Sequence, residues 1–258
     1  MDKDYRNCIQ RASQEIRNLL EEDFTSQLLQ IFDIDVLNAR WLENPGSHLY
    51  GKKLLIRDKL IAWILHKEAQ FKNRKETLQI LLREMAFTTL NRFIALKLME
   101  ERDLVRPCIS NGLKSEGFLE FTALCQGLLD DQWTAYQLYL ETIFEDISCE
   151  LKSLFDPREF SSLIWPSGPA LLKLLEIINQ SELSKLWVED ETLGWFYQYF
   201  NNDSERKKMR NESPFPRSSR ELAIRNQFFT PRYVVEFLTD NTLGLIWYEM
   251  LQGNTELK

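Results

Sequence analysis

KETLQILLREMAFTTLNRFIALKLMEER, residues 75–102, carries the strongest helical pattern in the chain. Its apolar side chains recur every three or four residues, which is the spacing of one face of an α-helix. Charged residues end the pattern, and Pro107 follows where a helix does not continue. We therefore expect a long helix with one apolar face here. Its apolar face comprises Leu78, Leu81, Leu82, Met85, Ala86, Thr89, Leu90, Phe93, Ile94 and Leu98.

Similar patterns on both sides of this stretch predict further helices. Leu, Ile, Glu, Lys and Gln, which favour helices, dominate the composition. The chain has only 9 glycines and 8 prolines, few for a β protein with many tight turns. The fold we predict is mainly α, a helical bundle. The expected helices cover residues 3–32, 53–70, 118–153, 157–163 and 170–179, and a break in the first of them around Asp23-Phe24-Thr25 is left open.

Composition and charge limit the class of protein. Hydrophobic residues make up 44% of the 258 residues, enough for a sizeable core, and the net charge of -7 argues against nonspecific nucleic-acid binding over the whole surface. The four cysteines show no CxxC spacing and the two histidines are isolated, so we expect reduced thiols and no metal site. Charged residues interrupt the N-terminus, and no run of about 18 apolar residues occurs. We expect a soluble, cytoplasmic protein with no signal peptide and no membrane span.

The segment Trp165-Pro166-Ser167-Gly168-Pro169 is the best candidate for an internal boundary. Its prolines make it a rigid linker. One continuous bundle is the alternative. We divide the chain into a helical N-terminal domain, residues 1–180, and a helical connector, residues 181–258, which is first aromatic and then basic.

The stretch from Asp203 to Arg232 is basic within an acidic chain. Eight basic residues stand there against four acids. Such an asymmetry is typical of a surface that faces phosphates, and an exposed linker with scattered charge is the alternative. The candidate DNA-contacting residues are Arg206, Lys207, Lys208, Arg210, Arg217, Arg220 and Arg225.

Two helix starts are predicted in the same stretch. Ser218 and Glu221 have the spacing of a capping box, so a short helix should run to about Arg225. Further on, Thr230 is placed as an N-cap and Pro231 as the first helical residue. An ordinary helix start is one interpretation. The other is an end that faces an anionic ligand, because its free N–H groups and two preceding aromatic residues suit one.

Two segments carry a resemblance to a known family. They are DETLGWFYQYF, residues 190–200, and NQFFTPRYVV, residues 226–235, with DNTLG, residues 240–244, after the second. Together they resemble the PglX-type adenine methyltransferases of BREX phage-defence systems. Related methyltransferases of DISARM systems, and more distantly the type I modification subunits, share the Gln-Phe-aromatic-Thr-Pro core. A weaker similarity covers residues 86–96.

The resemblance implies an enzyme that uses S-adenosylmethionine to methylate the exocyclic N6 of adenine in a short site of double-stranded DNA. It implies a Rossmann-like catalytic domain after the helical module, and other phage-defence proteins as partners. It also implies that the Gln-Phe-Phe-Thr-Pro segment lines the methionine side of the cofactor, which agrees with aromatic attraction to a sulfonium. The cofactor-binding residues expected on this basis are Gln227, Phe228, Phe229, Thr230 and Pro231.

The chain departs from the family pattern in one respect. It contains no G-x-G loop and no Asn/Asp-Pro-Pro-aromatic tetrapeptide, and its single Asn-Pro pair, Asn44-Pro45, is followed by Gly-Ser and reads as a turn. We therefore expect no catalytic residue in this chain, no methyl transfer by it alone, and weak or no cofactor binding. It is interpreted as the N-terminal portion of a methyltransferase, a fragment or a truncated product. The alternative is a stand-alone, non-enzymatic interaction subunit or adaptor of a defence complex.

Overall fold

A computed structural model describes residues 3–71, 73–125, 131–201, 203–217, 219–226 and 230–253. They form a mainly helical protein, as the sequence predicts. In chain order the elements are α1 (Lys3–Gln30), β1 (Ile34–Asp35), β2 (Arg40–Trp41), α2 (Lys52–Phe71), α3 (Arg74–Glu100), a 3-10 turn (Gly112–Lys114), α4 (Glu116–Leu124), α5 (Gln132–Ser148), α6 (Lys152–Phe155), a 3-10 turn (Phe160–Ser162), α7 (Gly168–Ile178), α8 (Thr192–Phe200), α9 (Asp203–Glu212), α10 (Ser219–Asn226), α11 (Arg232–Thr239), a π-helical turn (Asp240–Gly244) and α12 (Leu245–Leu251).

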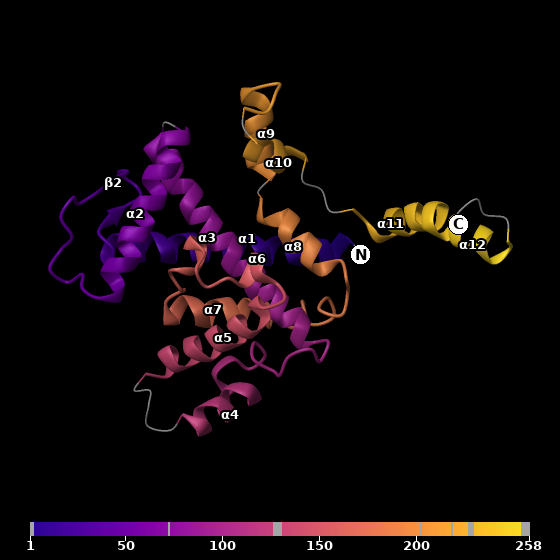
Figure 1. Cartoon of the computed structure of the whole chain (residues 1–258), viewed down its shortest axis with the longest axis horizontal. Coiled ribbons are helices and arrows are strands. Elements are labelled where there is room, and N and C mark those ends of the chain that lie inside the picture. The colour runs from indigo at the N-terminus through magenta and orange to yellow at the C-terminus, as the bar shows by residue number, and fades with distance from the viewer. Residues whose placement is uncertain are drawn as a thin grey trace.

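Helix α3 is the centre of the packed body, with α1, α2 and α8 against it (Figure 1). It begins at Asn73, whose side chain accepts the N–H of Glu76, and its side chains are buried on most faces. Even Arg92 is buried, and its guanidinium donates to the carbonyl of Leu154 at 2.7 Å and to the hydroxyl of Ser162 at 2.6 Å. The prediction of a helix over residues 75–102 is confirmed, and the structure shows that it lies in the core.

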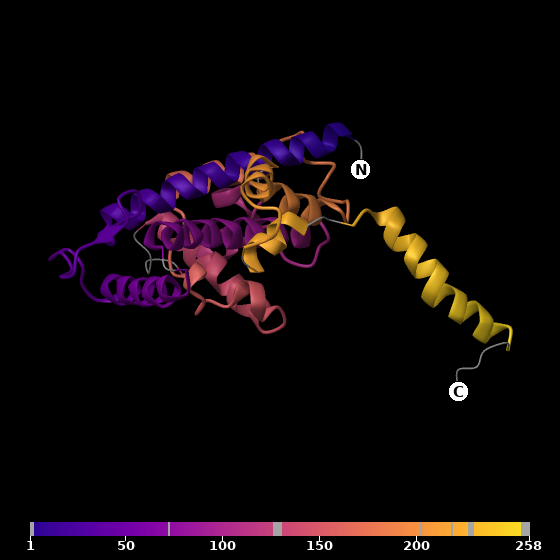
Figure 2. The same cartoon turned by 90° about the horizontal axis from the view of Figure 1, so that it is seen from above.

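Helix α1 runs without interruption along one side of the body (Figure 2). The break considered around Asp23-Phe24-Thr25 does not occur, because Phe24 is buried in the core and the hydroxyl of Thr25 donates to the carbonyl of Glu21 in the preceding turn. Tertiary packing of one apolar stripe therefore keeps the helix continuous.

Three local expectations differ from the structure. Strands β1 and β2 pair antiparallel, with Ile34 opposite Trp41, and form a short hairpin that the sequence analysis did not predict. The stretch predicted as one helical region from 118 to 153 is divided between α4, α5 and α6. The helix predicted over residues 157–163 is wrong, since only a 3-10 turn forms there. The carboxylate of Asp156 accepts the N–H of Arg158 and makes a local turn instead.

The Trp165–Pro169 linker lies inside the packed body. The ring of Trp165 stacks on Phe144 with centroids 5.4 Å apart, and the N–H of Ser167 donates to the carboxylate of Asp23 at 3.0 Å. The same core continues past residue 180 and includes Trp187, Phe196 and Phe200. The described residues between 9 and 200 thus contribute side chains to one continuous core.

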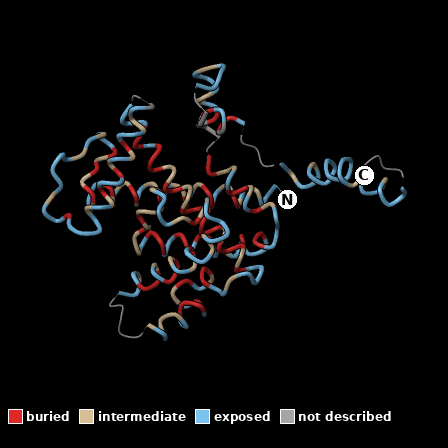
Figure 3. Tube along the Cα trace, viewed as in Figure 1, coloured by how far each residue is buried: buried red, intermediate tan, exposed pale blue. Residues whose placement is uncertain are grey.

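The chain leaves this body after α8. A hairpin of α9 and α10 stands at its edge, and α11, the π turn and α12 form a rod that points away from it (Figures 1 and 2). Figure 3 shows that the rod is mostly exposed and has no buried residue. Across the part of the chain that the structure describes, no helix has the length and apolar character needed to cross a membrane.

Candidate functional site

The start of α11 is held by a carboxylate from the packed body. An oxygen of Glu191, in the residue directly before α8, accepts the backbone N–H of Arg232 at 3.0 Å. The same side chain accepts the indole N–H of Trp195 at 3.3 Å. The N–H of Arg232 lowers the pKa of Glu191, although partial burial acts in the opposite direction. The two segments that resemble PglX-type enzymes, residues 190–200 and 226–235, therefore meet at this hydrogen bond.

This geometry corrects the predicted cap by one residue. Pro231, with an extended backbone at φ -60 and ψ 147, is the N-cap, and no side chain of the cap residue accepts a hydrogen bond. Thr230 is exposed and does not cap the helix. The carboxylate that satisfies the free N–H comes instead from Glu191, forty-one residues earlier in the sequence.

Of the five residues expected at the cofactor, Gln227, Phe228 and Phe229 lie outside the described residues. Thr230 is open to solvent and Pro231 is half-buried. The N–H that would attract a ligand carboxylate is already bonded to Glu191. Thr230 and Pro231 thus do not lie in an enclosed site among the described residues.

The rod beyond Pro231 is apolar and unpacked. No residue of α11, the π turn or α12 is buried, and Phe237 and Trp247 are 65% and 61% exposed. The side chain of Asn241 donates to the carbonyl of Phe237 at 2.7 Å, and that of Thr242 donates to the carbonyl of Leu238 at 2.6 Å. These two bonds satisfy backbone acceptors where the α-helix changes to a π-helix. The large exposed apolar residues are Tyr233, Val235, Phe237, Leu238, Leu243, Leu245, Ile246, Trp247, Tyr248, Met250 and Leu251.

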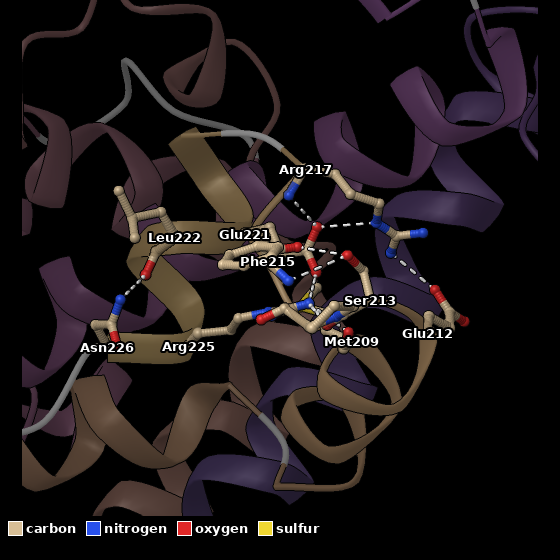
Figure 4. A network of polar contacts seen from close by, with 10 residues as sticks. Met209, Glu212, Ser213, Phe215, Arg217, Glu221, Leu222, Arg225 and Asn226 are labelled. Carbon is tan, nitrogen blue, oxygen red and sulfur yellow. Dashed lines mark hydrogen bonds and ion pairs between the residues drawn. The ribbon is translucent and has the colours of Figure 1, made fainter.

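The α9–α10 hairpin is held together by arginine and glutamate side chains (Figure 4). Arg225 is buried and donates to the carbonyls of Met209, Ser213 and Pro214 and to the carboxylate of Glu221. The N–H of Arg217 and the guanidinium groups of Arg217 and Arg225 lower the pKa of Glu221 to about 2. The capping box was expected to use this carboxylate, and it does reach back to the chain before α10, at the N–H of Arg217. Ser218 lies outside the described residues.

The hairpin uses most of its positive charge internally. Arg206 is buried and donates to the carbonyl of Gln198 at 2.8 Å, which ties α9 to α8. Arg217 pairs with both Glu212 and Glu221, at 2.8 and 3.0 Å. Arg210 is exposed but donates to the carbonyl of Arg225, and Lys207 is exposed. The side chains of Lys208 and Arg220 lie outside the described residues.

The comparison with known proteins confirms the resemblance predicted from residues 190–200 and 226–235. The chain resembles PglX. It is 24% identical over 248 residues to the adenine-specific methyltransferase PglX of Lacticaseibacillus casei (strain Zhang), and the alignment covers 81% of this chain and 20% of the relative. The chain thus spans about one fifth of the length of this curated relative. No protein-family model and no solved structure matches it.

Proposed function

We propose that this chain is a non-catalytic helical module of a site-specific, S-adenosylmethionine-dependent DNA adenine-N6 methyltransferase of a BREX- or DISARM-like phage-defence system. The similarity to PglX supports the family of activity, and it extends over most of this chain but only a fifth of the relative. In this proposal the packed body, residues 3–201, positions a catalytic domain, and the α11–α12 rod is the element that domain packs on.

The exposed rod is the observation that carries the proposal. Large apolar patches on a protein surface mark interaction sites, and a helix with an exposed apolar face needs a partner to bury that face. The rod begins at Arg232, whose N–H donates to Glu191 of the packed body, so the hydrogen bond joins the two segments that resemble the methyltransferases. Its apolar residues would become buried when a catalytic domain covers them, which gives hydrophobic stabilisation that this chain alone lacks.

The cofactor proposal is correspondingly limited. Gln227, Phe228, Phe229, Thr230 and Pro231 would form one edge of an S-adenosylmethionine site, and the remaining walls would come from the catalytic domain. Because Glu191 already bonds the first free N–H of α11, a cofactor carboxylate would compete with it there. We expect the isolated chain to bind the cofactor weakly or not at all by calorimetry, and micromolar affinity would contradict this proposal.

The same exposed rod also fits the second candidate, a stand-alone adaptor that docks on another defence protein. The DNA sequence of the gene distinguishes the two. A reading frame that continues into a G-x-G loop and a Pro-Pro-aromatic tetrapeptide favours the methyltransferase module, whereas a stop codon after Lys258 favours the adaptor.

In the protein encoded by the continuing frame, Phe237→Ser with Trp247→Ser should lower N6-adenine methylation by about tenfold to a hundredfold, because the catalytic domain loses its packing surface. Transfer of labelled methyl groups to DNA measures the loss. Leu119→Ser with Leu151→Ser is the matched control, since both leucines are exposed on the packed body, and it should leave activity unchanged. Equal losses in the two variants would argue against the rod as the packing surface.

A further inference from the structure

A second basic stretch, residues 52–75, includes helix α2 and the first two residues of α3. Eight basic residues stand there against two acids, Asp58 and Glu68, which is a larger excess of positive charge than in residues 203–232. The sequence predicts a helix over residues 53–70, and its charge was not assigned to a ligand there.

The structure separates six of these eight basic residues into two groups, since Lys72 lies outside the described residues and Lys75 is exposed in the first turn of α3. Three of them are committed to internal contacts. Arg57 is buried and donates to the carbonyl of Phe32 at 2.9 Å. Lys67 lies over the ring of Trp63, and Arg74 pairs with Glu68 at 3.1 Å while its guanidinium lies over the ring of Trp41. These three stabilise the fold and offer little charge to a ligand.

The second group is Lys52, Lys53 and Lys59, in the first eight residues of α2. All three are exposed, and no ion pair or hydrogen bond engages their ammonium groups within the part of the chain that the structure describes. The nearest acid in the sequence is Asp58, also exposed, so the start of α2 keeps an excess of positive charge. Three free ammonium groups so close together attract phosphates, and releasing the counterions of a polyanion favours binding.

The surroundings determine which side of α2 a polyanion can approach. The three lysines line a cleft of about 990 Å³, whose lining also includes the carboxylates of Asp131, Glu141 and Glu145. Those carboxylates would repel a phosphate inside the cleft. A phosphate backbone would therefore lie along the side of α2 that faces solvent outside the cleft. The lysine side chains are long enough to reach it there.

We propose that the first two turns of α2 bind the phosphate backbone of double-stranded DNA through Lys52, Lys53 and Lys59. The inference rests on the proposed function for the choice of DNA as the polyanion. The contact is independent of base sequence, because lysine ammonium groups at phosphates hold a duplex in position without reading its bases. It places DNA on the packed body, on an element that sequence analysis did not assign to it.

The test is the salt dependence of DNA binding by the 258-residue chain. A fluorescent duplex of about 30 base pairs is titrated with wild type and with Lys52→Ala/Lys53→Ala/Lys59→Ala between about 50 and 200 mM KCl. Each phosphate contact contributes about 0.9 to the slope of log K against log salt, so the triple variant should lose about 2 to 3 units of slope. An unchanged slope overturns the proposal.

A matched control removes three exposed lysines elsewhere, by Lys114→Ala/Lys152→Ala/Lys185→Ala. The proposal predicts that this variant keeps most of the slope, and an equal loss would show a net-charge effect and overturn it. Glu141→Gln/Glu145→Gln should strengthen binding, because it removes repulsion across the cleft.

The outcomes also separate this inference from the proposed function. If the wild-type chain binds DNA and the triple variant keeps the same salt slope, the α2 contact alone is overturned. Wild type that binds no duplex at these salt concentrations overturns the α2 contact and counts against DNA as the target of the module. Binding of an acidic protein through the three lysines, with no DNA binding, would also overturn it.

Discussion

Residues 52–75 and residues 203–232 each contain eight basic side chains, but the fold uses them differently. In α2 a long helix packs one face on α3, and the lysines of its first turns are exposed and have no partner among the described residues. In the α9–α10 hairpin, arginines turn inward to backbone carbonyls and to two glutamates. The comparison shows that a count of basic residues indicates a ligand surface only where the fold leaves those residues unpaired.

The reason for the difference is the amount of apolar surface in each region. Helix α2 has Leu60 and Ile64 fully buried, so hydrophobic packing holds it and its cations are not needed for that purpose. Among the described side chains of the α9–α10 hairpin, Ile224 is the one buried hydrophobic residue. Hydrogen bonds from Arg225 and Arg217 to carbonyls and carboxylates take the place of a core there.

The largest effect that would sharpen the comparison is expected at the one buried cation of α2. Arg57→Ala should lower the free energy of unfolding by about 2 to 4 kcal/mol, because it leaves the carbonyls of Phe32 and Leu42 without their charged donor. Urea denaturation measures the change. Lys53→Ala, the exposed control on the same helix, should change it by less than about 0.5 kcal/mol. Similar values for the two variants would contradict the division of α2 into structural and free cations.

A smaller, local effect is expected in the hairpin. Arg225→Met should raise amide hydrogen exchange in residues 203–226 by about tenfold and leave α3 unchanged, because it removes the donor shared by three carbonyls and Glu221. Arg217→Met is the control, with a weaker effect expected since Arg217 is exposed. If Arg225→Met exchanged like wild type, the hairpin would need another explanation for its stability.

The pH dependence of the same exchange follows from Glu221. Its pKa is lowered from 4.5 to about 2 in the folded hairpin, so the contribution of its carboxylate is complete above pH 4.5 and is lost as the pH falls toward 2. The Glu221→Gln variant should show no such loss over that window.

The smallest effect is expected on DNA binding, from the exposed cations of the α9–α10 hairpin. Lys207→Ala/Arg210→Ala should lower the salt slope of DNA binding by less than the α2 triple variant, because Arg210 is already engaged with the carbonyl of Arg225. Anisotropy titrations of the kind used for α2 give the comparison. A larger loss of slope from these two positions would reverse the ranking of the two regions. The DNA contact would then lie in residues 203–232, as the composition predicts.

The bounds of helices that pack an apolar face on the core could be predicted from the sequence. Helices α2 and α3 begin and end within two residues of their expected bounds. The start of α11 was placed one residue early, because its partner is not local. Glu191 precedes it by forty-one residues, and no cap rule based on adjacent residues can find such an acceptor. The segment from 157 to 163 failed for a related reason, as Asp156 bonds the chain two residues ahead and favours a turn over a helix.

The sequence by itself determined the helical class, the apolar faces that build the body, and the segments that resemble an adenine methyltransferase, because periodicity and motif are properties of neighbouring residues. Only the tertiary structure decided which charges are available to a partner. Whether an arginine or lysine is free depends on carbonyls and carboxylates that folding brings to it. Those partners put Arg206 and Arg225 inside the protein, and their absence leaves Lys52, Lys53 and Lys59 facing solvent among the residues described.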